Sequence, residues 1–176
     1  MFDRLRDLIK RDAIVHGRVV LSSGREADWY ADLRRVTLGG AGAPLVGQVM
    51  RRLTEDWSYA AVGGLTLGAD PVALAVVHAA AAAGTELDGF IVRKEQKQHG
   101  LQKRIEGPTV AGRRVLIVED TSTTGSSALA AVEAVREAGA EVVGVAAVLD
   151  RGGGETIRDH GLPFRAACTL DDLGLA

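Results

Sequence analysis

The chain has 176 residues, of which 47% are hydrophobic and 25% are charged. This length suits one domain of roughly 100–200 residues, and the apolar content excludes an intrinsically disordered chain. With 21 basic and 23 acidic side chains, the formal net charge of −2 excludes a polyanion binder that works by overall charge. A local basic patch remains compatible with this balance.

The cysteine content and the apolar runs indicate where in the cell the protein is located. Cys168 is the single cysteine, so the chain has no intramolecular disulfide, which fits a reducing compartment, and we expect a core thiol there. Residues 1–12 are charged throughout and lack the apolar run of a signal peptide. The longest apolar stretch, residues 71–83, is shorter than the roughly 20 residues of a membrane helix. We therefore expect a soluble, cytoplasmic protein without membrane or nucleic-acid partners.

The first part of the chain has mixed periodicity. Apolar residues at helical spacing predict an amphipathic N-terminal helix and a second helix; they are Phe2, Leu5, Leu8 and Ile9, then Leu45, Val46, Val49, Met50, Leu53 and Trp57. Between these helices, Arg18–Leu21 and Asp28–Leu33 read as short strands around a turn at residues 22–24. We expect about residues 1–40 to form a small hood over the rest.

The remainder alternates between strands and helices. Short apolar runs rich in β-branched residues predict strands at Ala60–Leu65, Phe90–Arg93, Val115–Glu119 and Val142–Leu149. Helical stretches near 70–83 and 126–138 separate most of them. This order predicts a single α/β domain over residues 1–176, with a parallel central sheet flanked by helices in the core, about residues 41–176. Ligands of such folds bind beyond the carboxyl ends of the strands.

One predicted strand ends in two carboxylates, Glu119 and Asp120, and a hydroxyl-rich loop follows. This loop contains Thr121, Ser122, Thr123, Thr124, Gly125 and Ser126 and leads into a helical pattern. Unpaired N–H groups at a helix N-terminus favour a phosphate, and Gly125 permits close approach of the backbone. The carboxylates suit vicinal ribose hydroxyls or a cation near them. A ribose 5-phosphate carries both groups.

Simpler explanations of this segment exist. Ser and Thr before a helix often serve as N-caps, although five hydroxyl residues exceed that need. A phospho-acceptor receiver would need a further acidic pair after its first strand, and a Walker loop is excluded because GxxxxGK[ST] is missing. The segment resembles the phosphoribosyl pyrophosphate signature of type I phosphoribosyltransferases. By that resemblance, Glu119 and Asp120 hold the ribose hydroxyls, and Thr121, Ser122, Thr123, Thr124, Gly125, Ser126 and Ser127 cradle the 5-phosphate.

A basic segment follows the predicted strand Phe90–Arg93. It carries Arg93, Lys94, Lys97, His99, Lys103 and Arg104 against the single acid Glu95. Such a run alone is usually a solvated surface, but at a strand end beside a phosphate loop it suits pyrophosphate, whose departure requires neutralised charge. The string RKExKxHG resembles the catalytic loop of orotate phosphoribosyltransferases. The resemblance implies that Arg93, Lys94, Lys97 and His99 contact pyrophosphate and that Lys97 is the principal catalytic residue.

Arg151 directly follows the predicted strand Val142–Leu149 and Asp150. Its guanidinium can grip a carboxylate through two parallel hydrogen bonds, or it can merely pair with Asp150 or Glu155 at the surface. The family has Leu-Asp-Arg here, so the resemblance implies that Arg151 binds the orotate carboxylate. Thr123 matches another position that contacts orotate. Trp29 and Tyr30 resemble the family's segment over the base, where Tyr30 is our candidate contact; ordinary hairpin packing remains an alternative.

The resemblance covers about residues 4–173 and implies a type I phosphoribosyltransferase fold. It implies transfer of the phosphoribosyl group to orotate, giving orotidine 5′-monophosphate in UMP synthesis, with Lys97, Glu119 and Asp120 in the catalytic machinery. It also implies a homodimer whose basic loop serves the neighbouring subunit, and Mg²⁺ held mainly by substrate, with no certain protein ligand. The alternatives are a phosphoribosyltransferase for another base, such as xanthine or hypoxanthine, and a regulator that senses phosphoribosyl pyrophosphate.

The sequence departs from the family at two places near the pyrophosphate. Ser22 stands where many members have lysine, and Thr66–Leu67 where some have a Tyr-Lys pair. We expect residues 63–68 to form a neutral, glycine-rich turn whose N–H groups replace these cations.

Overall fold

The computed structural model of the chain describes residues 1–20, 26–94 and 104–175. Its strands are β1 (Ile14–Val20), β2 (Glu26–Ala31), β3 (Ala61–Leu65), β4 (Asp88–Val92), β5 (Ile105–Glu106), β6 (Arg114–Ser122), β7 (Glu141–Asp150) and β8 (Phe164–Thr169). Its helices are α1 (Phe2–Leu8), continued by the π-helical η1 (Ile9–Ala13), α2 (Arg34–Thr37), α3 (Gly42–Leu53), α4 (Ala69–Ala82), α5 (Ser126–Glu137), α6 (Gly153–Asp159) and α7 (Leu170–Leu173).

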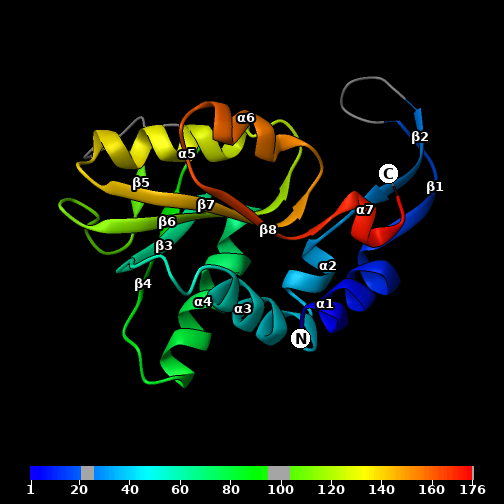
Figure 1. Cartoon of the computed structure of the whole chain (residues 1–176), viewed down its shortest axis with the longest axis horizontal. Helices are drawn as coiled ribbons and strands as arrows, with labels where there is room; N and C mark the ends of the chain where they lie inside the picture. The colour runs from blue at the N-terminus through cyan, green and yellow to red at the C-terminus, as the bar shows by residue number, and fades with distance from the viewer. Residues whose placement is uncertain (21–25, 95–103, 176) are drawn as a thin grey trace.

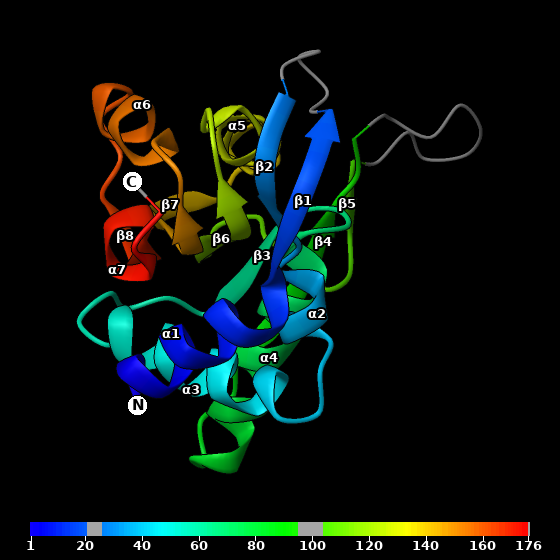
Figure 2. The same cartoon turned by 90° about the vertical axis from the view of Figure 1, so that its right-hand side faces the viewer.

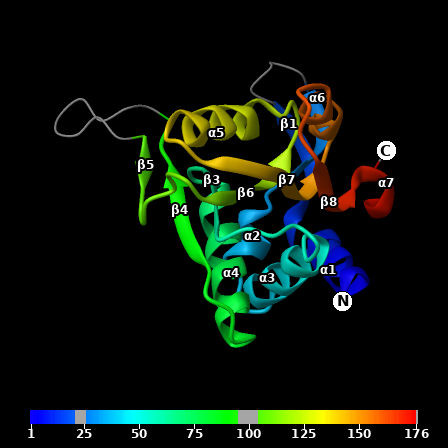
Figure 3. The same cartoon turned by 60° about the vertical axis from the view of Figure 1, so that its left-hand side comes forward.

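A central sheet organises the described residues. Its strand order is β5-β4-β3-β6-β7-β8, and all neighbours pair in parallel except β5, which runs antiparallel to β4 at one edge (Figure 3). Helices α3 and α4 cover one face, and α5 and α6 cover the other (Figure 1). Within the described part of the chain, no helix has both the length and the apolar character needed to span a membrane.

The central strand β6 has a continuous apolar run from Val115 to Val118, and the packing of the sheet explains it. Leu116 and Val118 point into the core beneath α3 and α4, whereas Val115 and Ile117 point into the core beneath α5. All four side chains are fully buried. Because both faces of a parallel sheet are covered, such strands lack polar alternation. The predicted α/β fold, with a parallel sheet between helices, is confirmed.

The N-terminal segment contributes to the core on the α3–α4 side. Leu5, Ile9, Leu33 and Val36 are at most 1% exposed and belong to the same apolar cluster as Met50 of α3. The antiparallel pair β1–β2 contributes Ile14 and Trp29 to this packing and lies beside the carboxyl ends of the sheet strands (Figure 2). The division into a hood and a core stays a prediction, since α1 and α2 share their packing with the core.

The predicted elements differ from the observed ones mainly at their ends. The second helix, expected through Trp57, ends at Leu53, where the Thr54 hydroxyl donates to the Met50 carbonyl at 2.9 Å. Trp57 instead packs beneath the guanidinium of Arg165, 4.5 Å from the ring centroid. The four predicted sheet strands are confirmed, whereas β8 was missed. Elements α2, β5, α6 and α7 also lack a counterpart among the predicted ones, because each is short.

The expected turn at residues 63–68 is wrong in its first half. Gly63 and Gly64 lie inside β3 and pair with β4. A Cβ atom on Gly63 would lie 2.2 Å from the Phe90 carbonyl oxygen, and one on Gly64 would lie 2.2 Å from that of Val118. These glycines therefore permit close approach of the flanking strands, and the turn is confined to residues 66–68.

Candidate active site

Four loops meet at the carboxyl edge of the sheet. Parallel pairing aligns Leu65 of β3 with Val92 of β4, and Ser122 of β6 with Asp150 of β7. The loops that follow these strands therefore start side by side. The end of β6 carries the acidic pair, and the loops carry most of the hydroxyl residues, Arg93 and Arg151, so the residues that the sequence predicts for one site gather at this edge.

The acidic pair lies at the end of β6, where Glu119 is buried and Asp120 is partly buried. Glu119 is 6% exposed, and burial, followed by the charge of Asp120, raises its pKa to about 7. Burial also raises the pKa of Asp120, against the opposing effects of the Thr121 N–H, which donates to Oδ1 at 2.7 Å, and of Arg34. A Cβ atom on Gly68 would lie 2.5 Å from Asp120 Oδ1, so this carboxylate faces the turn at residues 66–68.

The hydroxyl loop leads directly into α5. Thr123, Thr124, Ser126 and Ser127 are exposed, whereas Ser122 is 1% exposed. The N-cap residue is Gly125, with φ of +77°, and α5 has no side-chain cap hydrogen bond. Thr124 Oγ1 accepts the Ser126 N–H at 3.4 Å, but helix capping does not account for the other hydroxyl residues. The N–H groups of the first turn of α5 and the hydroxyls around them form a binding surface suited to a phosphate.

The hydroxyl loop packs tightly against the loop between β7 and α6. A Cβ atom on Gly153 would lie 2.3 Å from Ser122 Oγ and 2.7 Å from the Gly125 nitrogen. The Arg151 N–H donates to the Ser122 carbonyl at 2.8 Å. The two loops thus form one unit, which fixes Arg151 next to the hydroxyl loop.

The guanidinium of Arg151 stacks on Trp29, with Cζ 5.1 Å from the ring centroid. Asp150 does not pair with it, because Asp150 Oδ1 accepts the N–H groups of Gly152 and Gly154 at 2.9 and 3.1 Å. In the described residues Arg151 has no ion pair, and its buried Nε has no hydrogen-bond partner. The guanidinium is therefore available to an anionic ligand.

Trp29, rather than the sequence candidate Tyr30, contacts Arg151. Successive side chains of a strand point to opposite faces, so Tyr30 projects from the other face of β2. Trp29 packs against the apolar core cluster. The alternation of β2 is the signal that distinguishes the two aromatic residues, and the strand assignment of Asp28–Leu33 already contained it.

The structure describes only the two ends of the basic segment. Arg93 follows β4, its N–H donates to the Arg104 carbonyl at 2.7 Å, and its Nη1 lies 3.5 Å from Glu106 Oε1. Lys94 is exposed. Lys97 and His99 lie outside the described residues. Arg93 and Lys94 are therefore brought to the site edge, whereas the contacts assigned to Lys97 and His99 stay predictions.

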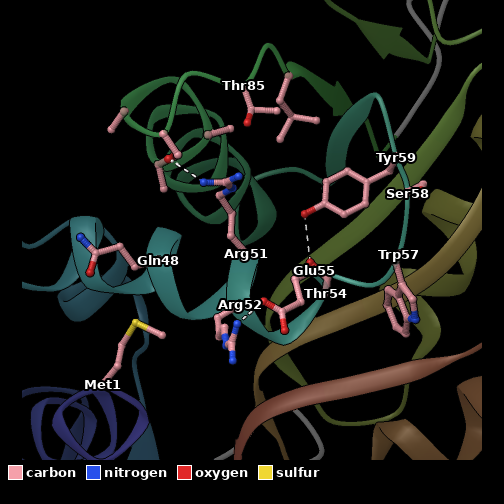
Figure 4. A pocket seen from close by; sticks show the side chains of 15 residues that line it. Met1, Gln48, Arg51, Arg52, Thr54, Glu55, Trp57, Ser58, Tyr59 and Thr85 are labelled. Atoms are coloured by element: carbon pink, nitrogen blue, oxygen red, sulfur yellow. Dashed lines mark hydrogen bonds and ion pairs between the residues drawn. The ribbon is translucent and has the colours of Figure 1, made fainter.

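A hollow of about 640 Å³ lies away from these loops, at the end of the sheet where β3 and β4 begin (Figure 4). Arg51 donates to the Ala79 carbonyl at 2.9 Å, and the Tyr59 and Thr54 hydroxyls lie 2.9 Å apart. Arg52 pairs with Glu55. The first of these contacts joins α3 to α4, and the other two lie at the end of α3 and in the loop that follows it. Both arginines that line the hollow are thus engaged, unlike Arg151.

Cys168 is not part of the site. It lies in β8, is 1% exposed, and its Sγ donates to the Val148 carbonyl at 3.3 Å. Burial raises the pKa of its thiol to about 12, so the thiol stays protonated. The predicted core thiol is confirmed.

Comparisons with known proteins agree with this geometry. The family model of the phosphoribosyl transferase domain matches residues 36–162. The orotate phosphoribosyltransferase of Streptomyces avermitilis is 65% identical over 170 residues, which cover 95% of this chain and 93% of that protein.

Solved structures of the orotate phosphoribosyltransferase of Mycobacterium tuberculosis H37Rv are also similar. The complex with Fe(III) dicitrate has a TM-score of 0.90 and 57% identity, and covers 99% of each chain. The complex with 5-phospho-alpha-D-ribosyl 1-diphosphate has a TM-score of 0.86 and 52% identity, again over 99% of each chain. This chain belongs to the orotate phosphoribosyltransferase family, within the phosphoribosyltransferases of type I fold.

Proposed function

We propose that this chain transfers the 5-phosphoribosyl group from phosphoribosyl pyrophosphate to orotate, giving orotidine 5′-monophosphate and pyrophosphate in UMP synthesis. The observation that carries the proposal is Arg151, an uncommitted guanidinium stacked on Trp29 beside a phosphate loop and an acidic pair. Orotate is a flat ring with a carboxylate. A guanidinium binds the carboxylate in two-pronged fashion, and an aromatic wall suits the ring.

The phosphoribosyl group would bind along β6 and the start of α5. Glu119 and Asp120 would accept hydrogen bonds from the two ribose hydroxyls, for which acceptor-only carboxylates are suited. The 5-phosphate would take N–H groups from the first turn of α5 and hydroxyls from the exposed Thr123, Thr124, Ser126 and Ser127. The hydroxyls and the phosphate of one sugar would thereby be held by a single strand–loop–helix unit.

The reaction at the sugar depends on positioning of the two substrates and on stabilisation of charge in the transition state, and it needs no nucleophilic side chain. The bond between ribose C1 and pyrophosphate breaks, the bond from C1 to the orotate ring nitrogen forms, and the sugar passes through an oxocarbenium-like state. Glu119 and Asp120 would favour this cation, and Lys97 would meet the charge that grows on the departing oxygen. Arg93, Lys94 and His99 would bind the remaining pyrophosphate oxygens.

We propose Mg²⁺ as the cofactor. In the described part of the chain, no three His, Cys, Asp or Glu side chains gather into a metal cage. Glu119 and Asp120 are hard oxygen donors at the right edge, which fits a metal whose other ligands are substrate oxygens and water. When bound, Mg²⁺ would neutralise negative charge on the pyrophosphate.

We propose further that two copies associate through an apolar surface formed by Leu38, Leu74 and Ile91. These side chains are 68%, 54% and 37% exposed. Leu38 and Leu74 line one hollow beside α4, and Leu74 and Ile91 line the next. The patch borders β4, from which the basic segment departs. Burial of this patch between two copies would let Lys97 act in the neighbouring subunit. We also propose that the protein is located in the cytoplasm.

Base competition tests this function against its alternatives. Purified protein is incubated with phosphoribosyl pyrophosphate, Mg²⁺ and equal amounts of orotate, uracil, xanthine and hypoxanthine, and the nucleotides formed are separated by chromatography. We expect orotidine 5′-monophosphate as the dominant product. A purine nucleotide as the main product would show that the enzyme uses a purine base instead of orotate. Binding of phosphoribosyl pyrophosphate without turnover of any base would indicate a regulator.

A further inference from the structure

The turn between β3 and α4 faces the ribose end of the proposed site without bringing a cation. Its residues Thr66, Leu67 and Gly68 are uncharged, and Gly68 lies directly against Asp120. Thr66 Oγ1 donates to Asp70 Oδ2 of α4 at 2.6 Å and is thereby engaged with the start of the following helix. A pyrophosphate leaving group adjoining the ribose hydroxyls therefore needs a positive charge from elsewhere.

Arg34 is held rigidly at its backbone. Leu33 and Val36 on either side are 1% exposed, and they anchor α2 in the core cluster shared with α3 and α4. The Asp32 N–H donates to the Ala13 carbonyl at 2.9 Å, which fixes the end of β2 just before Arg34. Helix α2 contacts α4, whose first residue follows Gly68. The short helix thus carries Arg34 to the flank of the same turn.

The terminal nitrogens of the Arg34 guanidinium are available to a ligand. Its Nε donates to Asp32 Oδ1 at 3.1 Å, which orients the guanidinium plane. Its terminal nitrogens make no hydrogen bond or ion pair within the ranges that the structure describes, and the side chain is 56% exposed. The charge of Arg34 lowers the pKa of Asp120, while that of Asp32 raises it, so both groups lie within electrostatic reach of the acidic pair.

We propose that Arg34 binds the pyrophosphate of the substrate and supplies the positive charge that the turn at residues 66–68 lacks. A guanidinium pinned at Nε still offers two terminal nitrogens to neighbouring phosphate oxygens, a geometry that arginine provides and lysine does not. Asp32 acts as a positioning residue, since it orients Arg34. This assignment rests on the proposed function, because it takes phosphoribosyl pyrophosphate as the ligand.

Titration calorimetry with inorganic pyrophosphate, in buffer containing Mg²⁺, tests Arg34 independently of turnover. Arg34→Ala should weaken pyrophosphate binding by roughly 10- to 150-fold, the range for losing a charge-assisted contact. Arg34→Lys should recover part of the loss. Ribose 5-phosphate, which reports Asp120 and the hydroxyl loop, should bind Arg34→Ala within about threefold of wild type. Arg35→Ala, at the exposed neighbouring position, is the matched control and should behave as wild type.

The assignment is overturned if Arg34→Ala binds pyrophosphate as wild type does, or if Arg35→Ala shows the same loss. It is also overturned if ribose 5-phosphate binding falls as much as pyrophosphate binding, because Arg34 would then act only through Asp120 or on the fold. Thermal unfolding of each variant verifies the fold. Absence of orotate turnover by wild type would instead refute the proposed function, and leave pyrophosphate binding to report Arg34 by itself.

Discussion

Under the proposed function, Arg151 is the side chain that selects orotate over other bases. Loss of its two-pronged contact should lower kcat/KM for orotate by roughly 10- to 150-fold in Arg151→Ala, at about 1.5–3 kcal/mol for a charged hydrogen bond. Uracil lacks the carboxylate, so any activity with uracil should barely change. Steady-state kinetics with both bases give the ratio of kcat/KM for orotate to kcat/KM for uracil, which should fall in the variant. Arg151→Lys should restore orotate use only in part.

Arg158 provides the matched control for Arg151, since its guanidinium also lies over an aromatic ring, 5.2 Å from the centroid of Phe164, but at an exposed position on α6. Arg158→Ala should leave the orotate-to-uracil ratio unchanged. If Arg151→Ala lowers both activities by the same factor, Arg151 has a structural role, and base selection must come from Thr123, Trp29 or Tyr30.

Glu119 links protonation to stability. Its pKa is raised from 4.5 to about 7 in the folded chain, chiefly by burial, so the folded state holds this proton more tightly than the unfolded state does. The stabilisation is present below pH 4.5 and is lost as pH rises through 7. At about 1.4 kcal/mol for each pH unit, the loss is on the order of 3 kcal/mol.

Urea unfolding of the ligand-free protein at pH 5 and pH 8 measures this effect. Relative to Glu119→Gln, wild type should lose stability between the two pH values, while the exposed Glu133→Gln variant should follow wild type. A difference between wild type and Glu119→Gln that stays constant with pH would show that burial does not raise the pKa of Glu119.

At the scale of elements, the loops after β6 and β7 should behave as one unit. Gly153→Ala would put a Cβ atom 2.3 Å from Ser122 Oγ and 2.7 Å from the Gly125 nitrogen, so the loops must separate. We expect a loss of about 1–3 kcal/mol in stability and a higher KM for phosphoribosyl pyrophosphate. Gly40→Ala, where a Cβ atom meets nothing within 4 Å, is the control. An unchanged KM for phosphoribosyl pyrophosphate in Gly153→Ala would contradict this prediction, because the hydroxyl loop would then bind its ligand independently of the loop after β7.

The sequence predicted those elements whose pattern is set by burial on both faces or at helical spacing. Strands β3, β4, β6 and β7 and helices α4 and α5 are of this kind. The strand β8 was missed because Phe164–Thr169 is short and only three of its six residues are buried, so its pattern is weak.

The candidate site was predictable where its residues adjoin one another in the chain. Glu119, Asp120 and the hydroxyl loop form one strand–loop–helix segment, so their spacing alone implies a common ligand. The stacking of Arg151 on Trp29 and the approach of Gly153 to Ser122 join distant segments. Such contacts depend on how the loops pack, which local patterns do not specify.

At the scale of the whole molecule, the proposed dimer predicts that a hybrid of two inactive variants regains activity, because each active site would draw Lys97 from the neighbouring copy. Lys97→Ala and Asp120→Asn would each be inactive alone, but one site of a mixed dimer would carry both defects and the other none. After mixing in equal amounts, activity should return to about one quarter of wild type, since half of randomly assembled dimers are hybrids with one intact site. No recovery in verified hybrids would mean that the basic segment serves its own chain.

The transfer of a phosphoribosyl group to orotate is the central proposed activity of this chain, and one assay measures it directly. Purified chain is mixed with orotate and phosphoribosyl pyrophosphate, and the loss of orotate absorbance is followed while the product is identified by mass. We expect orotidine 5′-monophosphate and pyrophosphate in equal amounts, with turnover abolished by excess EDTA and restored by Mg²⁺. If saturating substrates and Mg²⁺ yield no orotidine 5′-monophosphate from folded protein, the proposed function is wrong.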